Sequence, residues 1–159
     1  MELDENYTAP VAERSSFAAD AEAPVMFKRG DWYYALVGVP CCYCLGGSNA
    51  LVYMSKSVDG PWIFDKDIGS NPTPFDKHSP NNYVTKAQAQ KVFVVPGGAS
   101  DLEPAQYIWM GSQWNSGLSQ TPPGPRNHDL LYFARLIFNT NGTVAQLNWE
   151  PNITISLYS

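Results

Sequence analysis

The stretch Glu22-Ala23-Pro24-Val25-Met26-Phe27-Lys28-Arg29-Gly30-Asp31-Trp32-Tyr33-Tyr34 decides the fold. An acidic residue stands at the head of an apolar strand, and Arg29-Gly30-Asp31 then turns the chain into a second, aromatic strand. After a loop rich in Cys and Gly, a third apolar run covers residues 50–55 and ends in Ser57-Val58-Asp59-Gly60-Pro61-Trp62. This order predicts three antiparallel strands and a turn, which make most of one blade of a β-propeller.

The rest of the chain continues this pattern of short strands separated by turn residues. Residues 65–84 and 117–126 are rich in Pro, Gly, Asn and Ser and are expected to be connections. Alternating or apolar runs predict strands over residues 23–28, 32–37, 50–55, 62–64, 86–96, 106–111, 131–139, 144–149 and 152–158. Two rounds of hairpin, strand and long connection start near Ala23 and near Gln90, which is loosely the spacing of propeller blades with insertions.

Composition narrows the class of protein. The 159 residues fit one domain, and an apolar share of 44% with 13% aromatic residues predicts a packed, strand-rich core. No apolar run approaches the roughly 20 residues of a membrane-spanning helix. The net charge is −5 and the basic residues are scattered, which argues against a nucleic-acid partner.

Cys41, Cys42 and Cys44 are the only cysteines, and their odd number leaves several roles open. They form a disulfide within the loop, a disulfide to a part of the protein outside this chain, or a set of small buried side chains. A zinc site would need a fourth ligand and paired spacing, so we expect no metal among the site residues. No cofactor is expected, and a structural calcium ion is left open.

We expect no signal peptide in residues 1–159, because residues 1–6 lack a basic region and an apolar core. Three sequons, at Asn6, Asn141 and Asn152, give weak support for secretion, and we expect an extracellular protein.

A family resemblance rests on Glu22-Ala23-Pro24, Met26 to Asp31, Trp32-Tyr33-Tyr34 and Ser57 to Trp62, in this order and spacing. Together these segments resemble glycoside hydrolase family 43, five-bladed propellers that cleave arabinose, xylose or galactose linkages. The resemblance implies an all-β fold, a partial five-bladed β-propeller of about two to three blades. It also implies that residues 1–159 are the C-terminal part of a single such domain.

Glu22 is the candidate general acid, because the resemblance carries that role onto the Glu of the Glu-Ala-Pro segment. A glycosidase needs one protonated carboxyl for the leaving oxygen and a second group that activates water or attacks the sugar. In most of the family the base is an Asp in the first blade, and a further Asp tunes the pKa of the acid. Neither residue has a counterpart in this sequence. Asp31, Asp59, Asp65, Asp67 and Asp101 are expected in turns or connections, where solvation is the default.

Gln90 is the candidate partner of Glu22. In the galactan-cleaving branch of the family a Gln is thought to replace the base, and the spacing from Gln90 through Phe93 to Pro96 matches that branch best. Gln88 is the alternative, and a third reading is a polar residue that satisfies backbone groups at a strand start. An amide is a poor base, so the role rests on the resemblance.

Trp114 and Asn49 are the candidate substrate-binding residues. Trp114 stands where the family has a strand-ending Trp, although the charged residues of the family's Gly-Asp-Arg-Trp motif are replaced in Gly111-Ser112-Gln113-Trp114. Aromatic rings offer flat surfaces for sugar rings, and an Asn amide can bind sugar hydroxyls. The other tryptophans are equally compatible with core packing, and the role of His128-Asp129 stays open.

Two functions therefore compete. The first is a glycoside hydrolase acting on galactan, arabinan or xylan side chains, truncated here and weakly active alone. The second is a non-catalytic propeller remnant that binds glycan or a protein partner. In either case the uncovered blade edges predict self-association, and the expected substrate or ligand is a polysaccharide or oligosaccharide.

Overall fold

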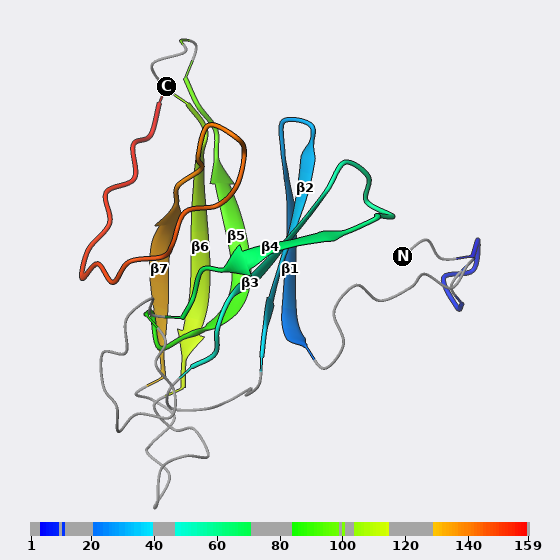
Figure 1. Cartoon of the computed structure of the whole chain (residues 1–159), viewed down its shortest axis with the longest axis horizontal. Coiled ribbons are helices and arrows are strands. Elements are labelled where there is room, and N and C mark those ends of the chain that lie inside the picture. Colours follow the sequence, from blue (N-terminus) through cyan, green and yellow to red (C-terminus); the bar gives the residue numbers. More distant parts are fainter. Residues whose placement is uncertain are drawn as a thin grey trace, which may run out of the picture.

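The computed structural model describes residues 4–9, 11, 21–39, 47–70, 84–98, 100, 104–114 and 129–158. These residues form two antiparallel sheets without a helix (Figure 1). The strands are β1 (Glu22–Arg29), β2 (Trp32–Gly38), β3 (Leu51–Ser55), β4 (Ile63–Asp67), β5 (Gln88–Val95), β6 (Gln106–Gln113) and β7 (Leu130–Leu136). Within them no helix is long and apolar enough to cross a membrane.

The first sheet has the strand order β1-β2-β3-β4 and grows outward from the hairpin that the sequence predicts. β1 and β2 are joined by a two-residue loop in which Gly30 has a φ of 56°. Glycine adopts this backbone without a Cβ penalty, and the first position of a type II′ hairpin turn requires it.

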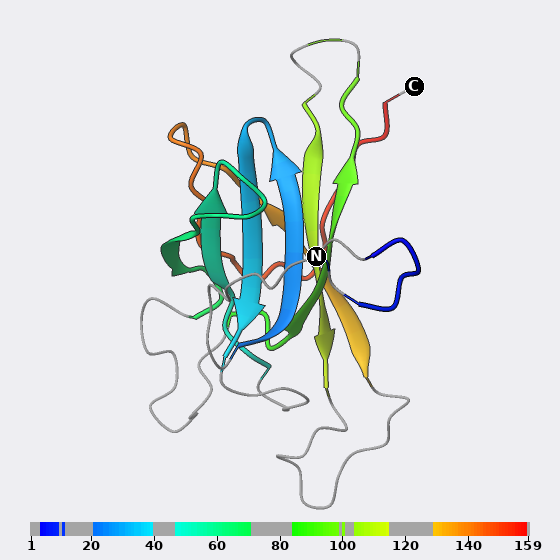
Figure 2. The same cartoon turned by 90° about the vertical axis from the view of Figure 1, so that its right-hand side faces the viewer.

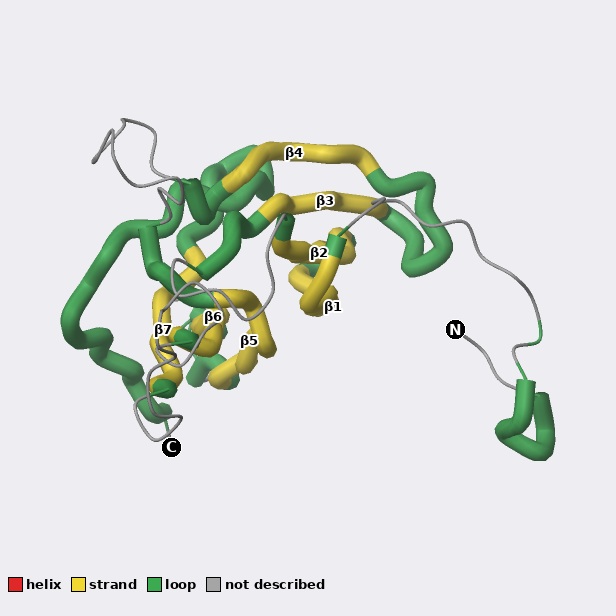
Figure 3. Tube along the Cα trace, turned by 90° about the horizontal axis from the view of Figure 1, so that it is seen from below, coloured by secondary structure: helices red, strands yellow, loops and turns green. Residues whose placement is uncertain are grey.

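The second sheet has the order β5-β6-β7 and lies beside the first, with the inner strands β1 and β5 packed together. The view in Figure 3 shows both sheets extending outward from this contact, so that β4 and β7 lie on the outside. Each sheet thus has the arrangement of one propeller blade, with its first strand innermost.

Figure 2 shows the blue strands of the first sheet beside the green and yellow-green strands of the second. The hydrophobic core contains buried residues from both sheets. Phe27 stacks on Tyr34 with ring centroids 5.0 Å apart, and Tyr107 from the second sheet packs on Phe27 at 5.5 Å. Trp109 is buried in the same cluster. Aromatic packing across the two sheets therefore holds the blades together.

Residues 138–150 form a second connection between the blades. The turn at Gly142 accepts a hydrogen bond from the Tyr34 hydroxyl, at 2.7 Å. The side-chain nitrogen of Gln146 donates to the carbonyl oxygens of Ile68 and Ser70, both at 2.7 Å. Because Ile68 and Ser70 follow β4, this segment ties the outer part of the first sheet to the second.

Three parts of the chain differ from the strands predicted from the sequence. Asp65 and Asp67 lie in β4 and not in a connection. The segment 144–149 contributes a single bridge, between Phe138 and Val144, in place of a strand. Residues 152–158 form no ladder, and the side chain of Gln106 makes two hydrogen bonds to the backbone of Ser156.

Candidate functional site

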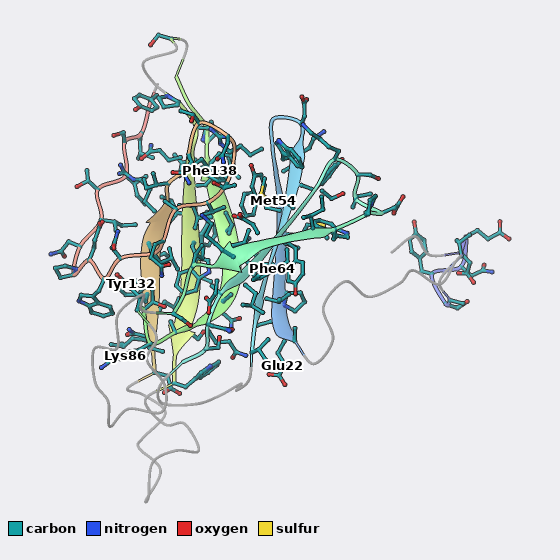
Figure 4. The ribbon with its side chains drawn as sticks, in the orientation of Figure 1. Glu22, Met54, Phe64, Lys86, Tyr132 and Phe138 are labelled. Atoms are coloured by element: carbon teal, nitrogen blue, oxygen red, sulfur yellow. The ribbon has the colours of Figure 1, made fainter. Side chains whose placement is uncertain are left out.

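The candidate site lies where β1 and β5 begin, which we call the Glu22 end of the molecule. Figure 4 shows Glu22 at this end, and Lys86, two residues before β5, lies at the same end of the neighbouring sheet. β1 and β5 are packed together, and both inner strands begin at this end of the molecule.

Glu22 is exposed and stands at an irregularity in the first sheet. The register pairs Glu22 with Gly38 and Val25 with Leu36, so β1 carries one extra residue between these pairs. Ala23, next to Glu22, has a φ of 50°, a left-handed conformation that a residue with a Cβ rarely adopts. Bulges and strained backbone of this kind re-aim side chains and are frequent beside active sites.

Asn49 lies at the same end, where its side chain fixes the loop between β2 and β3. Its Oδ1 accepts a hydrogen bond from the backbone N–H of Val39, at 2.6 Å. The preceding Ser48 is buried, and Gly47 is so close to the start of the second sheet that a Cβ there would lie 2.4 Å from the nitrogen of Ala87. The loop therefore locks the two sheets together beside Glu22.

Gln88 and Trp114 lie at the same end of the β5-β6 pair, where β5 begins and β6 ends. The indole Nε1 of Trp114 donates to Oε1 of Gln88, at 3.0 Å. Gln88 is only 6% exposed. A neighbouring bond from Gln113 Nε2 to the carbonyl of Thr85, at 3.0 Å, fixes the end of β6 against the segment before β5. Gln88 is therefore placed to hold Trp114.

Gln90 has the opposite environment, although it lies only two residues further along β5. The register pairs Ala89 with Gly111 and Lys91 with Met110, which leaves Gln90 as the extra residue of a bulge. Its side chain is exposed. Both candidate catalytic residues thus stand at bulges near the starts of the two inner strands.

The two carboxylates of β4 have structural surroundings of their own. Asp67 accepts hydrogen bonds from the backbone of Ala50, Gly69 and Ser70 and from the Ser70 hydroxyl, so it holds the end of β4. Asp65 is the extra residue of a bulge in β4, and one of its carboxylate oxygens is buried without a hydrogen-bond partner. Both therefore lie on the outermost strand of the first sheet.

Several residues of interest lie outside the described part of the chain. These are Cys41, Cys42, Cys44, Asp101 and His128. Among the residues that the structure describes, no group of three or more His, Cys, Asp or Glu side chains could hold a metal ion.

The loop at Gly47 and Ser48 was not anticipated from the sequence, although it shapes the Glu22 end. The signal was present in Gly46-Gly47-Ser48-Asn49, because paired glycines mark places where backbones approach closely. The bulges have no comparable sequence signal.

Solved structures of glycoside hydrolases share this fold. An exo-β-1,3-galactanase from Clostridium thermocellum aligns at 21% identity with a TM-score of 0.58, over 81% of this chain and 23% of that protein. A β-1,3-galactosidase named as a member of glycoside hydrolase family 43 aligns at 19% identity with a TM-score of 0.64, over 93% and 27%. An exo-β-1,3-galactanase from Phanerochaete chrysosporium, solved with galactose, aligns at 19% identity with a TM-score of 0.57, over 91% and 28%.

These likenesses confirm the all-β, partial-propeller fold and agree with the family that the sequence motifs resemble. The chain spans about a quarter of the length of these solved structures. No protein-family model and no curated protein sequence matches the chain.

Proposed function

We propose that this chain is the acid-bearing part of a glycoside hydrolase that cleaves O-glycosidic bonds in galactan, arabinan or xylan side chains. The observation that carries the proposal is the position of Glu22, exposed at a bulge at the start of β1, the strand of the first sheet that packs against the second sheet. The likeness to galactan-cleaving enzymes favours a β-1,3-galactan chain as the substrate.

In this mechanism Glu22 is the general acid. Its carboxyl donates a proton to the glycosidic oxygen as the bond from that oxygen to the anomeric carbon breaks, and water supplies the hydroxyl that the anomeric carbon gains. An exposed carboxyl at the end of an inner strand can reach a substrate that lies across the blade boundary.

Gln90 is the proposed partner of Glu22, in preference to Gln88. A group that contacts water or sugar must be accessible, and Gln90 is exposed whereas Gln88 is buried and bonded to Trp114. Gln90 would orient the attacking water, and Gln88 acts as a positioning residue for the indole.

Trp114 and Asn49 are the proposed substrate-binding residues. Trp114 is partly exposed, and its ring is oriented by the bond to Gln88, which favours stacking against a sugar face. Asn49 uses Oδ1 to hold Val39, which leaves its side-chain NH₂ group as a donor for a sugar hydroxyl.

A second candidate function is a glycan-binding propeller part without catalysis. It is favoured by one observation: within the described residues, the other carboxylates at this end, Asp67 and Asp129, lie in or next to the outer strands β4 and β7, and Asp67 is bound to backbone N–H groups. Secretion is proposed for both functions, because extracellular polysaccharide is the expected ligand.

The test uses the full chain with β-1,3-galactotriose, an aryl arabinofuranoside and an aryl xyloside. We expect slow hydrolysis of the galactotriose that Glu22→Gln reduces by about 10²- to 10⁴-fold, the usual contribution of a general acid. Glu150→Gln is the matched control, because Glu150 is also an exposed carboxylate but follows β7 on the far side of the second sheet. The control variant should hydrolyse at the parent rate.

Binding measured by calorimetry separates the two functions. Galactotriose binding that is weakened by Trp114→Ala, without hydrolysis by the parent chain, would favour the binding function. Hydrolysis that persists unchanged in Glu22→Gln would refute the role of Glu22.

A further inference from the structure

Trp149 presents a rigid aromatic face to solvent on the outer side of the second sheet. The residue is 53% exposed, and its indole stacks on the ring of Tyr132 with centroids 4.5 Å apart and an interplanar angle of 12°. Because one face of the indole covers Tyr132, the other face is the one left for a ligand. Figure 4 shows Tyr132 on the side of the second sheet that lies away from Glu22.

The backbone on both sides of the following turn is anchored. The Tyr132 hydroxyl donates to the carbonyl oxygen of Glu150 at 2.9 Å and accepts from its N–H at 2.7 Å. Four residues later, the guanidinium of Arg135 donates to the carbonyl oxygen of Thr154. The span between these anchors is short, and Pro151 restricts it further by fixing its own φ.

Asn152 stands in this span and opens the sequon Asn152-Ile153-Thr154. Asn152 and Thr154 are both exposed, and the chain bends at Pro151 between Trp149 and Asn152. Within the part of the chain that the structure describes, no hydrogen bond engages the Asn152 amide. A sequon three residues after a fixed, half-exposed indole therefore places an acceptor amide beside an aromatic platform.

We propose that Asn152 is an N-glycosylation site and that the first N-acetylglucosamine of its glycan stacks on the exposed face of Trp149. In the transfer step the Asn152 nitrogen forms a bond to C1 of a polyprenyl-pyrophosphate-linked oligosaccharide. The bond from C1 to the phosphate oxygen breaks, the polyprenyl pyrophosphate leaves, and the amide loses one proton. The C–H face of the attached sugar then covers indole surface that is otherwise in water.

The sequon at Asn141 provides an internal contrast with the same spacing. Phe138 lies three residues before Asn141, but its ring packs against Tyr34 and Tyr107 at 5.4 and 5.2 Å. The guanidinium of Arg29 lies over the Phe138 ring at 4.3 Å. A glycan at Asn141 would therefore find no free face on Phe138, which distinguishes this sequon from the one at Asn152.

The proposal rests on passage through a secretory pathway and not on the proposed hydrolysis. The first test secretes the full chain from eukaryotic cells and maps its glycopeptides by mass spectrometry before and after treatment with peptide N-glycanase. We expect Asn152 to be occupied, and Asn152→Gln should remove that glycan alone. An unoccupied Asn152 in the secreted chain would overturn the assignment.

The second test asks whether the sugar contacts Trp149. The chain is trimmed enzymatically to one N-acetylglucosamine per site. Its Tm is compared with that of the Asn152→Gln variant, trimmed in the same way, which lacks only the sugar at residue 152. We expect the single sugar to raise the Tm by about 2–4 °C, the size of shift that one good contact gives in a chain of this length.

Trp149→Leu is the critical variant, because leucine still covers Tyr132 but offers no flat face to the sugar. In the Trp149→Leu chain, the sugar at Asn152 should no longer raise the Tm. The sugar at Asn141 should not change the Tm: the Asn152→Gln variant with one sugar at Asn141 should melt at the same temperature as the same variant made without glycosylation in bacteria. A gain at Asn152 of equal size with and without Trp149 would refute the stacking.

Discussion

Two phenols in the core, Tyr34 and Tyr132, illustrate how single hydroxyl groups hold this fold. Each donates to a backbone carbonyl oxygen of the segment that joins the blades, Tyr34 to Gly142 and Tyr132 to Glu150. Burial raises the pKa of both phenols above the ordinary value of 10.0, because the charged phenolate is poorly solvated there. The neutral forms are therefore the ones that stabilise the fold.

This pKa shift predicts a loss of stability at alkaline pH. A raised folded-state pKa means that the folded chain binds more protons than the unfolded chain between the two pKa values, so the free energy of unfolding falls as pH rises in that window. The contribution is complete below about pH 10, where the unfolded phenol begins to ionise. Urea titrations from neutral to alkaline pH should show the decline.

Tyr132→Phe tests the source of that decline. The variant should lose about 1 kcal/mol at neutral pH from the missing hydrogen bonds and should show a shallower alkaline decline. Tyr7→Phe is the control, because Tyr7 is 81% exposed. If the free energy of unfolding falls as steeply with pH in Tyr132→Phe as in the parent chain, groups other than Tyr132 cause the fall.

The two glutamines of β5 show where sequence reasoning about the site reaches its limit. Residues two apart in a regular strand share a face, so the sequence alone predicts that the side chains of Gln88 and Gln90 point to the same side of the sheet. The bulge at Gln90 breaks this rule and leaves one amide buried and the other exposed. Bulges arise from pairing between strands, which is why the roles of the two glutamines could be separated only in three dimensions.

At the scale of elements, the strands with clear alternation were predicted well. The hairpin of β1 and β2 was predictable because its apolar positions alternate and Arg29-Gly30-Asp31 marks the turn. β4 was predicted too short, because Asp65, Lys66 and Asp67 look like a solvated connection. Their charges suit an outer strand, where one edge faces water.

The segment 144–149 was predicted as a strand because Asn141-Gly142 is a strong hairpin signal. The turn does form, since the N–H of Gly142 donates to the carbonyl of Asn139 at 2.9 Å. Beyond it the hydrogen bonds of Gln146 and Leu147 go to Ile68, on the other sheet. Long-range bonds of this kind override a local pattern and cannot be read from it.

Gln146 should therefore matter more to stability than its polar character suggests. Gln146→Leu removes two hydrogen bonds and leaves the carbonyl of Ser70 short of a donor, so we expect a loss of about 1–2 kcal/mol. Gln106→Leu is the matched control, because Gln106 also makes two side-chain bonds to backbone but in an exposed place.

Chemical denaturation measures the free energy of unfolding of the Gln146→Leu and Gln106→Leu variants against that of the parent chain. The Gln106 variant should lose well under 1 kcal/mol, since water can replace its bonds. Equal losses in the two variants would argue that Gln146 does not link the blades.

At the scale of the whole molecule, the residues that the structure describes cover the two faces of the first sheet unequally. Its inner face packs on the second sheet, whereas the outer face carries a row of neighbouring apolar residues, which are Met26, Ala35, Tyr53 and Phe64. Met26 and Phe64, at the two ends of this row, are 49% and 52% exposed. A blade inside a propeller has neighbours on both faces, so this outer row has the character of a blade interface.

We therefore expect the chain to self-associate through the outer face of the first sheet. Light scattering should give a mass above that of one chain that rises with concentration, because apolar surface leaves water when two such faces meet. A Met26→Lys and Phe64→Lys double variant should shift the equilibrium to the monomer, since two lysines would face their copies across the contact. Leu157→Lys is the control, because Leu157 is 84% exposed but lies outside the row. A parent chain that stays monomeric at every concentration, or a double variant that associates as the parent does, would show that this face is stable in water without a partner.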